Sequence, residues 1–389
     1  MRILRPSQVK FGTEAEPGRD YGDRVRPKPP RIYNGLRGVR KWDKNKAWPG
    51  YTLFSPAFGD TSYLIDMNGR VVHSWPVVHS QWGELNPDGS LFWDNYFGGL
   101  FESDVDGNLV WTWHGRTHHD YHRYPDTGAI LTLYQRDRDR PDIFSRGPIQ
   151  DDMIVQIDGD SFVHWEWWLS DHVDELVELG GLELPRNQAD WAHTNTLTVL
   201  PDNPIGREDP RFREGNFLLS HRALDIISIV DQDSKDIVWA WGLGTLDGQH
   251  QAQMLDNGHI LLFDNGTLRG HSIIREFDPC EPDNVIWTYE DPKNFASPFR
   301  AGQQRLPNGN TLICEADCGH IFEVTPEKEI VWDYYSPFFG GQLVNVYRAA
   351  RYAPEHVEPW LDPGILGHSK EGEYRRPKQS WTADSPKEL

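Results

Sequence analysis

Short apolar segments alternate with turns along most of this chain, and two hairpin patterns recur. The first is an apolar strand, a turn rich in Asp, and a strand in which aromatic residues occupy alternate positions. Its six copies are LIDMNGRVVHSW (64–75), ESDVDGNLVWTW (102–113), VQIDGDSFVHWEW (155–167), SIVDQDSKDIVWAW (228–241), REFDPCEPDNVIWTY (275–289) and FEVTPEKEIVWDY (322–334). A period of two residues is typical of β-strands that bury one face. The pattern therefore predicts antiparallel hairpins.

The second pattern lies between these hairpins and consists of a strand, a tight turn and another strand. Asn-Gly and Asp-Gly turns are strong hairpin signals because both residues tolerate positive φ. The copies are ELNPDGSLFW (84–93), HRYPDTGAILTL (122–133), QMLDNGHILLF (253–263), QRLPNGNTLIC (304–314) and residues 196–220, which carry an insertion at the turn. Two hairpins per repeat make a four-stranded antiparallel blade.

The sixth copy of the second pattern is split between the two ends of the chain. Segment 50–58 (GYTLFSPAF) and segment 344–354 (VNVYRAARYAP) would form it together and close a ring. The sequence therefore predicts an all-β fold, a six-bladed β-propeller spanning residues 48–354. Residues 1–47 are expected to form an extended N-terminal arm and residues 355–389 a polar C-terminal tail. Residues 171–183 are expected to form an inserted helix.

Composition and charge narrow the range of partners. The formal net charge of −20 argues against nucleic acid and anionic membrane surfaces as partners. No apolar run reaches the length of a membrane span or of a signal peptide, so a cytoplasmic location is expected.

The three cysteines are too few for a disulfide framework. Segments 104–108 and 231–236 resemble calcium loops but lack the distant glutamate, and they are interpreted as blade turns. The sequence leaves open a homo-oligomer.

Propeller topology concentrates the histidines at one mouth of the central channel. The start of each innermost strand and the loop between the second and third strands lie on the same face of a blade. Positions of the first kind include His79, His118, His119, His193, His250 and Arg300, and positions of the second kind include His221, Arg222, His271 and His320. Imidazoles clustered in a cleft are a frequent basis of functional sites, so the mouth is the candidate site.

Several of these segments resemble the PAPS-independent arylsulfotransferase family. The segments are HHDYHRYPDTG, DWAHTNTL, LLSHRALDIISI, QHQAQMLDNGHILLFDNG, LPNGNTL and GHIFEVTPEKEIVWDYYSP, and the likeness runs over residues 48–353. The resemblance implies a six-bladed propeller that moves a sulfuryl group between small phenolic compounds without a cofactor. It also implies a histidine nucleophile helped by further histidines and an arginine.

By motif position, the resemblance places the nucleophile at His320, with His193 and His250 as supporting histidines. Arg222, His119 and His271 complete the expected catalytic set at the mouth. The arginine that the family carries after FDNG falls on Ile273 in this sequence. A neutral imidazole is a competent nucleophile near neutral pH, and cationic neighbours stabilise the charge on sulfuryl oxygens.

Two other functions fit the same residues. A metal-dependent lyase, hydrolase or oxygenase of small aromatic substrates would use His119, His193, His250 and His320 as ligands of Zn, Fe, Cu or Ni. In that case Asp120 or Asp264 would orient the imidazoles. A non-enzymatic interaction scaffold is the third alternative, and it would not need histidines that face the channel.

Overall fold

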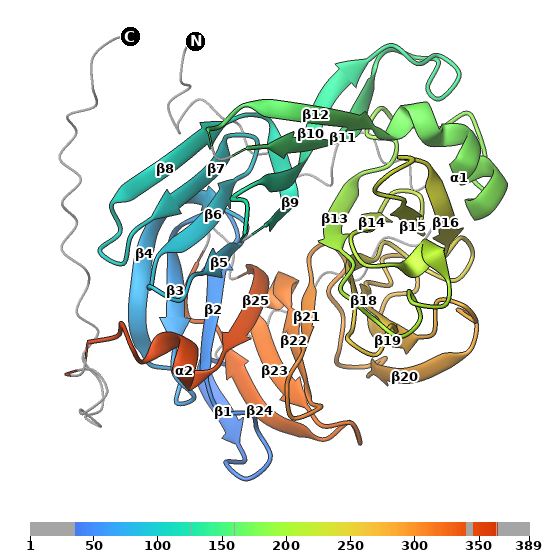
Figure 1. Cartoon of the computed structure of the whole chain (residues 1–389). Helices are drawn as coiled ribbons and strands as arrows, with labels where there is room; N and C mark the ends of the chain where they lie inside the picture. Colours follow the sequence, from blue (N-terminus) through green and yellow to red (C-terminus); the bar gives the residue numbers. More distant parts are fainter. Residues whose placement is uncertain (1–35, 125, 159, 340–344, 363, 365–389) are drawn as a thin grey trace.

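Six antiparallel sheets surround a central axis in the computed structural model (Figure 1). The structure describes residues 36–124, 126–158, 160–339, 345–362 and 364. Most of residues 1–47 and of residues 355–389, expected to be an arm and a tail, lie outside these ranges. The predicted six-bladed propeller is confirmed, and the innermost strand of each blade faces the axis (Figure 1).

The first three blades consist of the following strands, from the innermost strand outward. Blade 1 consists of β25 (Val346–Tyr352), β2 (Tyr51–Pro56), β3 (Gly59–Ile65) and β4 (Val71–Ser80). Blade 2 consists of β5 (Gly83–Leu85), β6 (Leu91–Asn95), β7 (Gly99–Ser103) and β8 (Leu109–His114). Blade 3 consists of β9 (Thr117–Arg123), β10 (Ile130–Arg138), β11 (Ile149–Ile157) and β12 (Val163–Trp168).

The other three blades follow the same order. Blade 4 consists of β13 (Thr194–Val199), β14 (Phe217–His221), β15 (Ile226–Val230) and β16 (Ile237–Trp241). Blade 5 consists of β17 (His250–Met254), β18 (Ile260–Asp264), β19 (Ile273–Phe277) and β20 (Val285–Glu290). Blade 6 consists of β21 (Gly302–Arg305), β22 (Thr311–Glu315), β23 (His320–Val324) and β24 (Ile330–Tyr335), with β1 (Gly38–Trp42) as a fifth, outer strand.

Blade 1 is closed by both ends of the chain, as the split sixth copy predicted. β25 pairs antiparallel with β2, from Tyr51 opposite Tyr352 to Pro56 opposite Val346. The fully buried Arg351 guanidinium forms an ion pair with the fully buried Glu323 of blade 6. Its Nε donates to Thr52 Oγ1 at 3.1 Å. Removing one partner of such a buried pair costs about 3–5 kcal/mol, so this contact is a strong tie across the closure.

The alternating aromatics of the outer strands explain why the repeat contains so many tryptophans. In blade 3, Trp167 Nε1 donates to the carbonyl of Lys235, in the turn between β15 and β16 of blade 4, at 2.9 Å. Such a bond gives the indole N–H a partner where the ring packs against the next blade. The same contact to the next blade recurs from Trp241 to Asp283 Oδ1 at 3.3 Å, from Trp287 to Pro326 at 2.8 Å and from Trp332 to Met67 at 2.9 Å.

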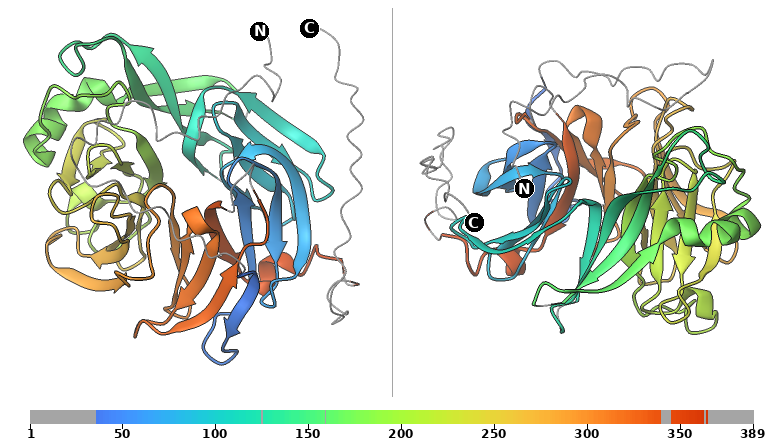
Figure 2. Two further views of the ribbon diagram at one scale, coloured as in Figure 1. Left: turned by 180° about the vertical axis from the view of Figure 1, so that it is seen from behind. Right: turned by 90° about the horizontal axis from the view of Figure 1, so that it is seen from above.

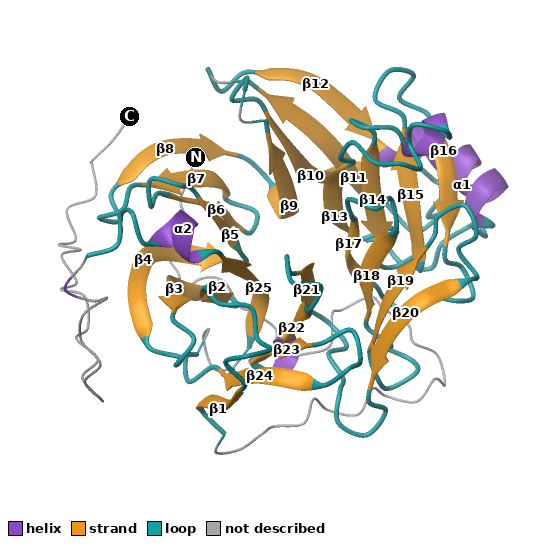
Figure 3. Cartoon of the chain, turned by 60° about the horizontal axis from the view of Figure 1, so that its bottom comes forward, coloured by secondary structure: helices purple, strands orange, loops and turns teal. Residues whose placement is uncertain are grey.

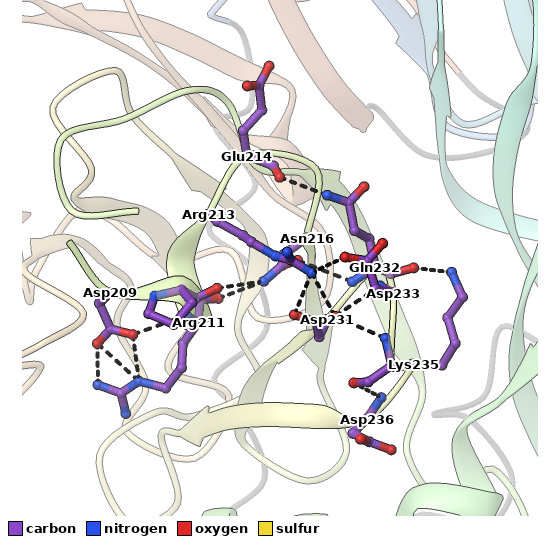
Figure 4. Close-up of polar contacts among 12 residues, drawn as sticks. Asp209, Arg211, Arg213, Glu214, Asn216, Asp231, Gln232, Asp233, Lys235 and Asp236 are labelled. Carbon is purple, nitrogen blue, oxygen red and sulfur yellow. Dashed lines mark hydrogen bonds and ion pairs between the residues drawn. The ribbon is translucent and has the colours of Figure 1, made fainter. Parts of the chain in front are cut away.

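The turn between β15 and β16 was expected to be a blade turn rather than a calcium loop. Figure 4 shows Arg213, from the insertion of blade 4, reaching the carboxylates of Asp231 and Asp233. The distances from Arg213 Nη2 are 2.9 Å to Asp231 and 2.6 Å to Asp233. An arginine therefore neutralises the carboxylates that a calcium ion would need.

Helices lie at the periphery of the ring (Figures 2 and 3). The expected insertion is a 3-10 turn at Leu169–His172 followed by α1 (Val173–Gly180), which packs against β16. A short helix, α2 (Pro354–Val357), was not predicted, and its Val357 packs into the core of blades 1 and 2. No helix in the described ranges is long and apolar enough to cross a membrane.

The predicted boundaries of the propeller need one extension at each end. β1 pairs with β24 from Gly38 opposite Tyr335 to Trp42 opposite Trp332, so part of the expected arm belongs to blade 6. Leu361 of the expected tail is buried in the same core as Val357. No residue of the edge strand β1, GVRKW, is fully buried, so its sequence lacks apolar alternation and gave no strand signal.

Candidate functional site

A cavity of about 650 Å³ opens at the mouth between blades 2, 3 and 4. This volume is in the range typical of small-molecule sites. Its walls combine imidazoles, carboxylates, arginines and aromatic rings. The lining includes Tyr96, Phe97, Arg116, His118, His119, Phe144, Arg146, Asp152, Asp190, His193 and Arg222.

The lining residues come from the two kinds of segment that the topology predicted. His119 belongs to β9, and His193 immediately precedes β13, so both lie at the start of an innermost strand. Phe97 and Arg222 come from the loops that join the second and third strands of blades 2 and 4. The structure therefore brings together three members of the expected catalytic set: His119, His193 and Arg222.

The backbone carries an unusual conformation at the cavity histidines. His119 has φ of 61° and His193 has φ of 51°, in the left-handed region that side chains with a Cβ rarely adopt. His119 lies where the pairing of β9 with β10 is irregular, and His193 precedes a similar irregularity at the start of β13. Such strain costs on the order of 1–3 kcal/mol per residue and is concentrated at functional sites. His79 and Gln251 have the same conformation, so it is a repeated feature of the blades that the two cavity histidines share.

Three imidazoles form a connected group on one side of the cavity. The Nδ1 atoms of His118 and His119 are 2.8 Å apart, so a hydrogen bond joins the two rings. The ring centroids of His119 and His193 are 4.9 Å apart. Burial, followed by the charge of His193, lowers the pKa of His118 to about 4, and the same two causes hold that of His119 well below its usual value. Both rings are therefore neutral near pH 7.

His193 has a carboxylate partner that the sequence did not indicate. Its Nδ1 lies 2.5 Å from Asp190 Oδ2. Burial alone would raise the pKa of Asp190, but the charge of His193 and this hydrogen bond bring it below its usual value. Asp190 is therefore an ionised acceptor, and the proton in this bond belongs to His193 Nδ1.

His250 lies next to this group, at the start of β17, although it does not line the cavity. Its Nδ1 is 2.8 Å from Asn265 Oδ1 and 3.1 Å from the carbonyl of Gly248. Burial and the nearby charge of Arg222 hold its pKa well below the usual value. Since both nearby atoms are oxygens, Nδ1 donates, and the neutral ring keeps a lone pair on Nε2.

An arginine that sequence reasoning missed supplies positive charge to the histidines. Arg348 lies on β25 and is buried, and its charge contributes to the lowered pKa values of His119 and His250. It donates to Asp120 Oδ1 at 3.0 Å and to the carbonyl of Asn195 at 3.0 Å. The sequence feature that could have identified Arg348 is an arginine within the largely apolar strand that closes the propeller.

Ile273, at the position of the family arginine, is a buried residue of β19. Two arginines near it are held by Asp264, through Arg269 Nη1 at 3.0 Å and Arg275 Nε at 2.8 Å. Asp264 therefore binds Arg269 and Arg275, and Asp120 binds Arg348. The metal-dependent alternative expected one of these two carboxylates to orient an imidazole, and in the structure both bind arginines instead. The positive charge beside the histidines comes from Arg222 and Arg348.

The structure places His320 in a setting that argues against its role as the nucleophile. Its Nδ1 lies 2.7 Å from Glu315 Oε2 and its Nε2 lies 2.7 Å from Asp333 Oδ1. Its ring is stacked between Phe322 and Tyr335, with centroid distances of 4.5 and 4.2 Å. Burial lowers the pKa of His320, but the hydrogen bonds to the two carboxylates bring it above the usual value. Both ring nitrogens are engaged by carboxylates, so neither is open to attack sulfur.

His271 also lies apart from the cavity. Its Nε2 is 3.4 Å from Glu290 Oε2, on the outer strand of blade 5. Neither His271 nor His320 lines the cavity. The structure thus separates these two members of the expected set from His119, His193 and Arg222.

The four proposed metal ligands do not form a compact set. Across the residues that the structure describes, one group of histidine and carboxylate atoms lies within 4.8 Å of one another, namely His172, Glu175 and Asp236. It belongs to α1 and the turn before β16, outside the cavity. The ring nitrogens of His119, His193, His250 and His320 do not converge in this way.

Comparisons with known proteins agree with this fold. Residues 68–336 match the model of a family described as arylsulfotransferase (ASST). No curated protein matches the sequence. Among solved structures, a protein of unknown function from Bacteroides caccae is 13% identical with a TM-score of 0.52, over 78% of this chain and 99% of that one. A catalytically inactive virginiamycin B lyase from Staphylococcus aureus, solved with quinupristin, is 10% identical with a TM-score of 0.46, over 80% of this chain and 94% of that one. The likeness to the Bacteroides caccae protein concerns the fold alone. Because the family model covers more than half of the chain, the protein belongs to the arylsulfotransferase family.

Proposed function

We propose that the cavity between blades 2, 3 and 4 transfers a sulfuryl group from an aryl sulfate to a phenol through a covalent histidine intermediate. The observation that carries the proposal is the meeting of a neutral imidazole, a second histidine and an arginine in one cavity. His119 and His193 lie side by side there, and Arg222 lines the same wall. A neutral imidazole supplies the nucleophile, and a guanidinium stabilises charge on the sulfuryl oxygens.

The remaining walls suit the aromatic part of such a substrate. Tyr96, Phe97 and Phe144 line the cavity, and the guanidiniums of Arg116 and Arg146 lie 5.6 and 5.2 Å from the rings of Phe97 and Phe144. Paired rings and cations of this kind bind a flat, anionic aryl ester at both of its ends. Small phenolic compounds are therefore the proposed substrates.

The test is a transfer assay with a nitrophenyl sulfate as donor and phenol as acceptor. The proposal expects nitrophenol release that depends on the acceptor, with parallel lines in double-reciprocal plots because the two substrates react in turn. His193→Asn should lower kcat by about 100-fold or more, in the range of lost acid–base catalysis. His164→Asn is the matched control, because His164 is an exposed histidine that also pairs with a carboxylate, at 2.6 Å from Asp158.

A metal-dependent reaction of the same substrates predicts a different result in this assay. Dialysis against a chelator would abolish activity, and a transition metal would restore it. The sulfuryl-transfer proposal expects an unchanged rate after dialysis. A folded protein that neither transfers sulfuryl groups nor binds an aryl sulfate would instead favour an interaction scaffold.

A further inference from the structure

The two adjacent histidines at the start of β9 form a unit that none of the comparisons assigns. We propose that His118 holds His119 in the tautomer that presents an unprotonated Nε2, and that this nitrogen is the nucleophile for the sulfuryl group. This inference rests on the proposed function and names the reacting atom within it. His118 is then a positioning residue and His119 the catalytic one.

A hydrogen bond joins the rings of His118 and His119. The Nδ1 atoms lie 2.8 Å apart and both rings are buried, so one of these atoms carries a proton and the other accepts it. Two neutral rings therefore allow two arrangements. In one of them His118 donates and His119 has its proton on Nε2. In the other His119 donates and its Nε2 is a lone pair.

The surroundings of His118 select the second arrangement. Its Nε2 is buried, has no hydrogen-bond partner among the described residues and lies 3.5 Å from Asp152 Oδ1. Asp152 also accepts bonds at both oxygens, from Thr194 N at 2.6 Å to Oδ2 and from Gln135 Nε2 at 3.3 Å to Oδ1. Burial raises the pKa of Asp152 to about 7. In its ionised form, the Asp152 oxygen attracts a proton on Nε2 and repels a lone pair there, so we place the His118 proton on Nε2. Its Nδ1 must then accept from His119.

The same chain of groups disperses charge when His119 reacts. Attack by Nε2 forms a nitrogen–sulfur bond and gives the ring an imidazolium character. The proton on Nδ1 then shifts toward His118, whose other side faces Asp152. This is the arrangement by which a carboxylate supports a histidine in hydrolytic triads, here with a second imidazole between them.

His193 completes the proton balance of both half-reactions. In the first, the sulfur–oxygen bond of the donor breaks and its electron pair stays on the phenolate oxygen, which takes a proton from His193. In the second, the acceptor phenol returns a proton to His193 while its oxygen displaces nitrogen from sulfur. Asp190, 2.5 Å from His193 Nδ1, stabilises the protonated ring that this exchange requires.

A spectroscopic measurement on the full chain tests the tautomer without relying on activity. Long-range proton–nitrogen correlation spectra of histidine-labelled protein distinguish Nδ1–H from Nε2–H rings, and the signals of His119 are identified by their loss in His119→Gln. The inference expects Nδ1–H for His119 and Nε2–H for His118. An Nε2–H tautomer of His119 in an active protein would overturn the inference and leave the proposed function intact.

Kinetics of two His118 variants test the positioning role. The amide oxygen of His118→Asn lies near the place of Nδ1 and still accepts from His119, so kcat should stay within a few-fold of the wild type. His118→Ala lacks an acceptor and should lose about 10- to 100-fold in kcat, with KM for the donor little changed. Equal losses in both variants would contradict the tautomer role. A wild type with the expected tautomers and no sulfuryl transfer would contradict the proposed function.

Discussion

The clearest prediction concerns His320, where family resemblance and structure lead to opposite expectations. Replacing His320 with Gln should leave sulfuryl transfer within a few-fold of the wild type, because the ring binds two carboxylates and does not line the cavity. The same change should lower the free energy of unfolding. A glutamine is neutral, so it leaves the carboxylates of Glu315 and Asp333 without their cation.

The size of the loss follows from how deeply each carboxylate is buried. The side chain of Glu315 is 3% exposed and that of Asp333 is 22% exposed, so water reaches only the second. Breaking a buried ion pair costs about 3–5 kcal/mol, and the partial exposure of Asp333 places the expected loss near the lower end, at about 3 kcal/mol. The measurement is urea denaturation of both proteins. His164→Gln serves as control and should lose less than about 1 kcal/mol, because its side chain is 61% exposed.

The contribution of His320 should also depend on pH in a defined direction. Its pKa in the folded protein is raised above the ordinary value, which is about 6.5. Its stabilisation is therefore complete below about pH 6.5 and is lost as pH rises through the folded-state pKa. The difference in stability between the wild type and His320→Gln should shrink over that range. A folded His320→Gln protein that has lost all transfer activity would refute this reasoning and restore His320 as the nucleophile.

Three further predictions concern ring closure, backbone strain and the site. Glu323→Gln should lower the free energy of unfolding in urea by about 3–5 kcal/mol, because Arg351 stays buried without its carboxylate. The control is Glu329→Gln, which breaks an exposed ion pair with Lys46 and should lower it by less than about 1 kcal/mol. Lys328→Gly should raise the melting temperature by relieving up to about 1–2 kcal/mol of strain at φ of 70°, while Glu327→Gly, next to it in the same turn, should lower it. Asp190→Asn should reduce kcat by about 10- to 100-fold with little change in stability, measured in the transfer assay and by melting, and an unchanged kcat would remove Asp190 from the proton path.

Much of the fold could be predicted because each blade repeats a local pattern. The Asn-Gly and Asp-Gly turns and the alternating aromatics locate the hairpins, and a split copy at the two ends indicates the closure. β1 escaped detection because an exposed edge strand needs no apolar alternation. The partners of the tryptophans were also hidden, since the carbonyl that Trp332 reaches belongs to Met67 at the other end of the chain.

The site was only partly predictable, for a physical reason. Propeller topology places histidines at one mouth of the channel, and the structure brings His119 and His193 together there. Topology does not show which of these imidazoles pairs with a carboxylate. Asp333 and Glu315 hold the pKa of His320 above its usual value, while Arg348 reaches the histidines from the last strand of the propeller. Such contacts depend on side-chain direction and burial, which the pattern of residue types does not encode.

The most direct test of the cavity as a sulfuryl-transfer site is the mass of the protein after brief exposure to an aryl sulfate without acceptor. The account predicts a gain of one sulfuryl group per chain, carried by the peptide that contains His119 and removed when phenol is added. A sulfuryl group on the peptide that contains His320, or a protein that gains none while it transfers sulfuryl groups between substrates, would contradict it.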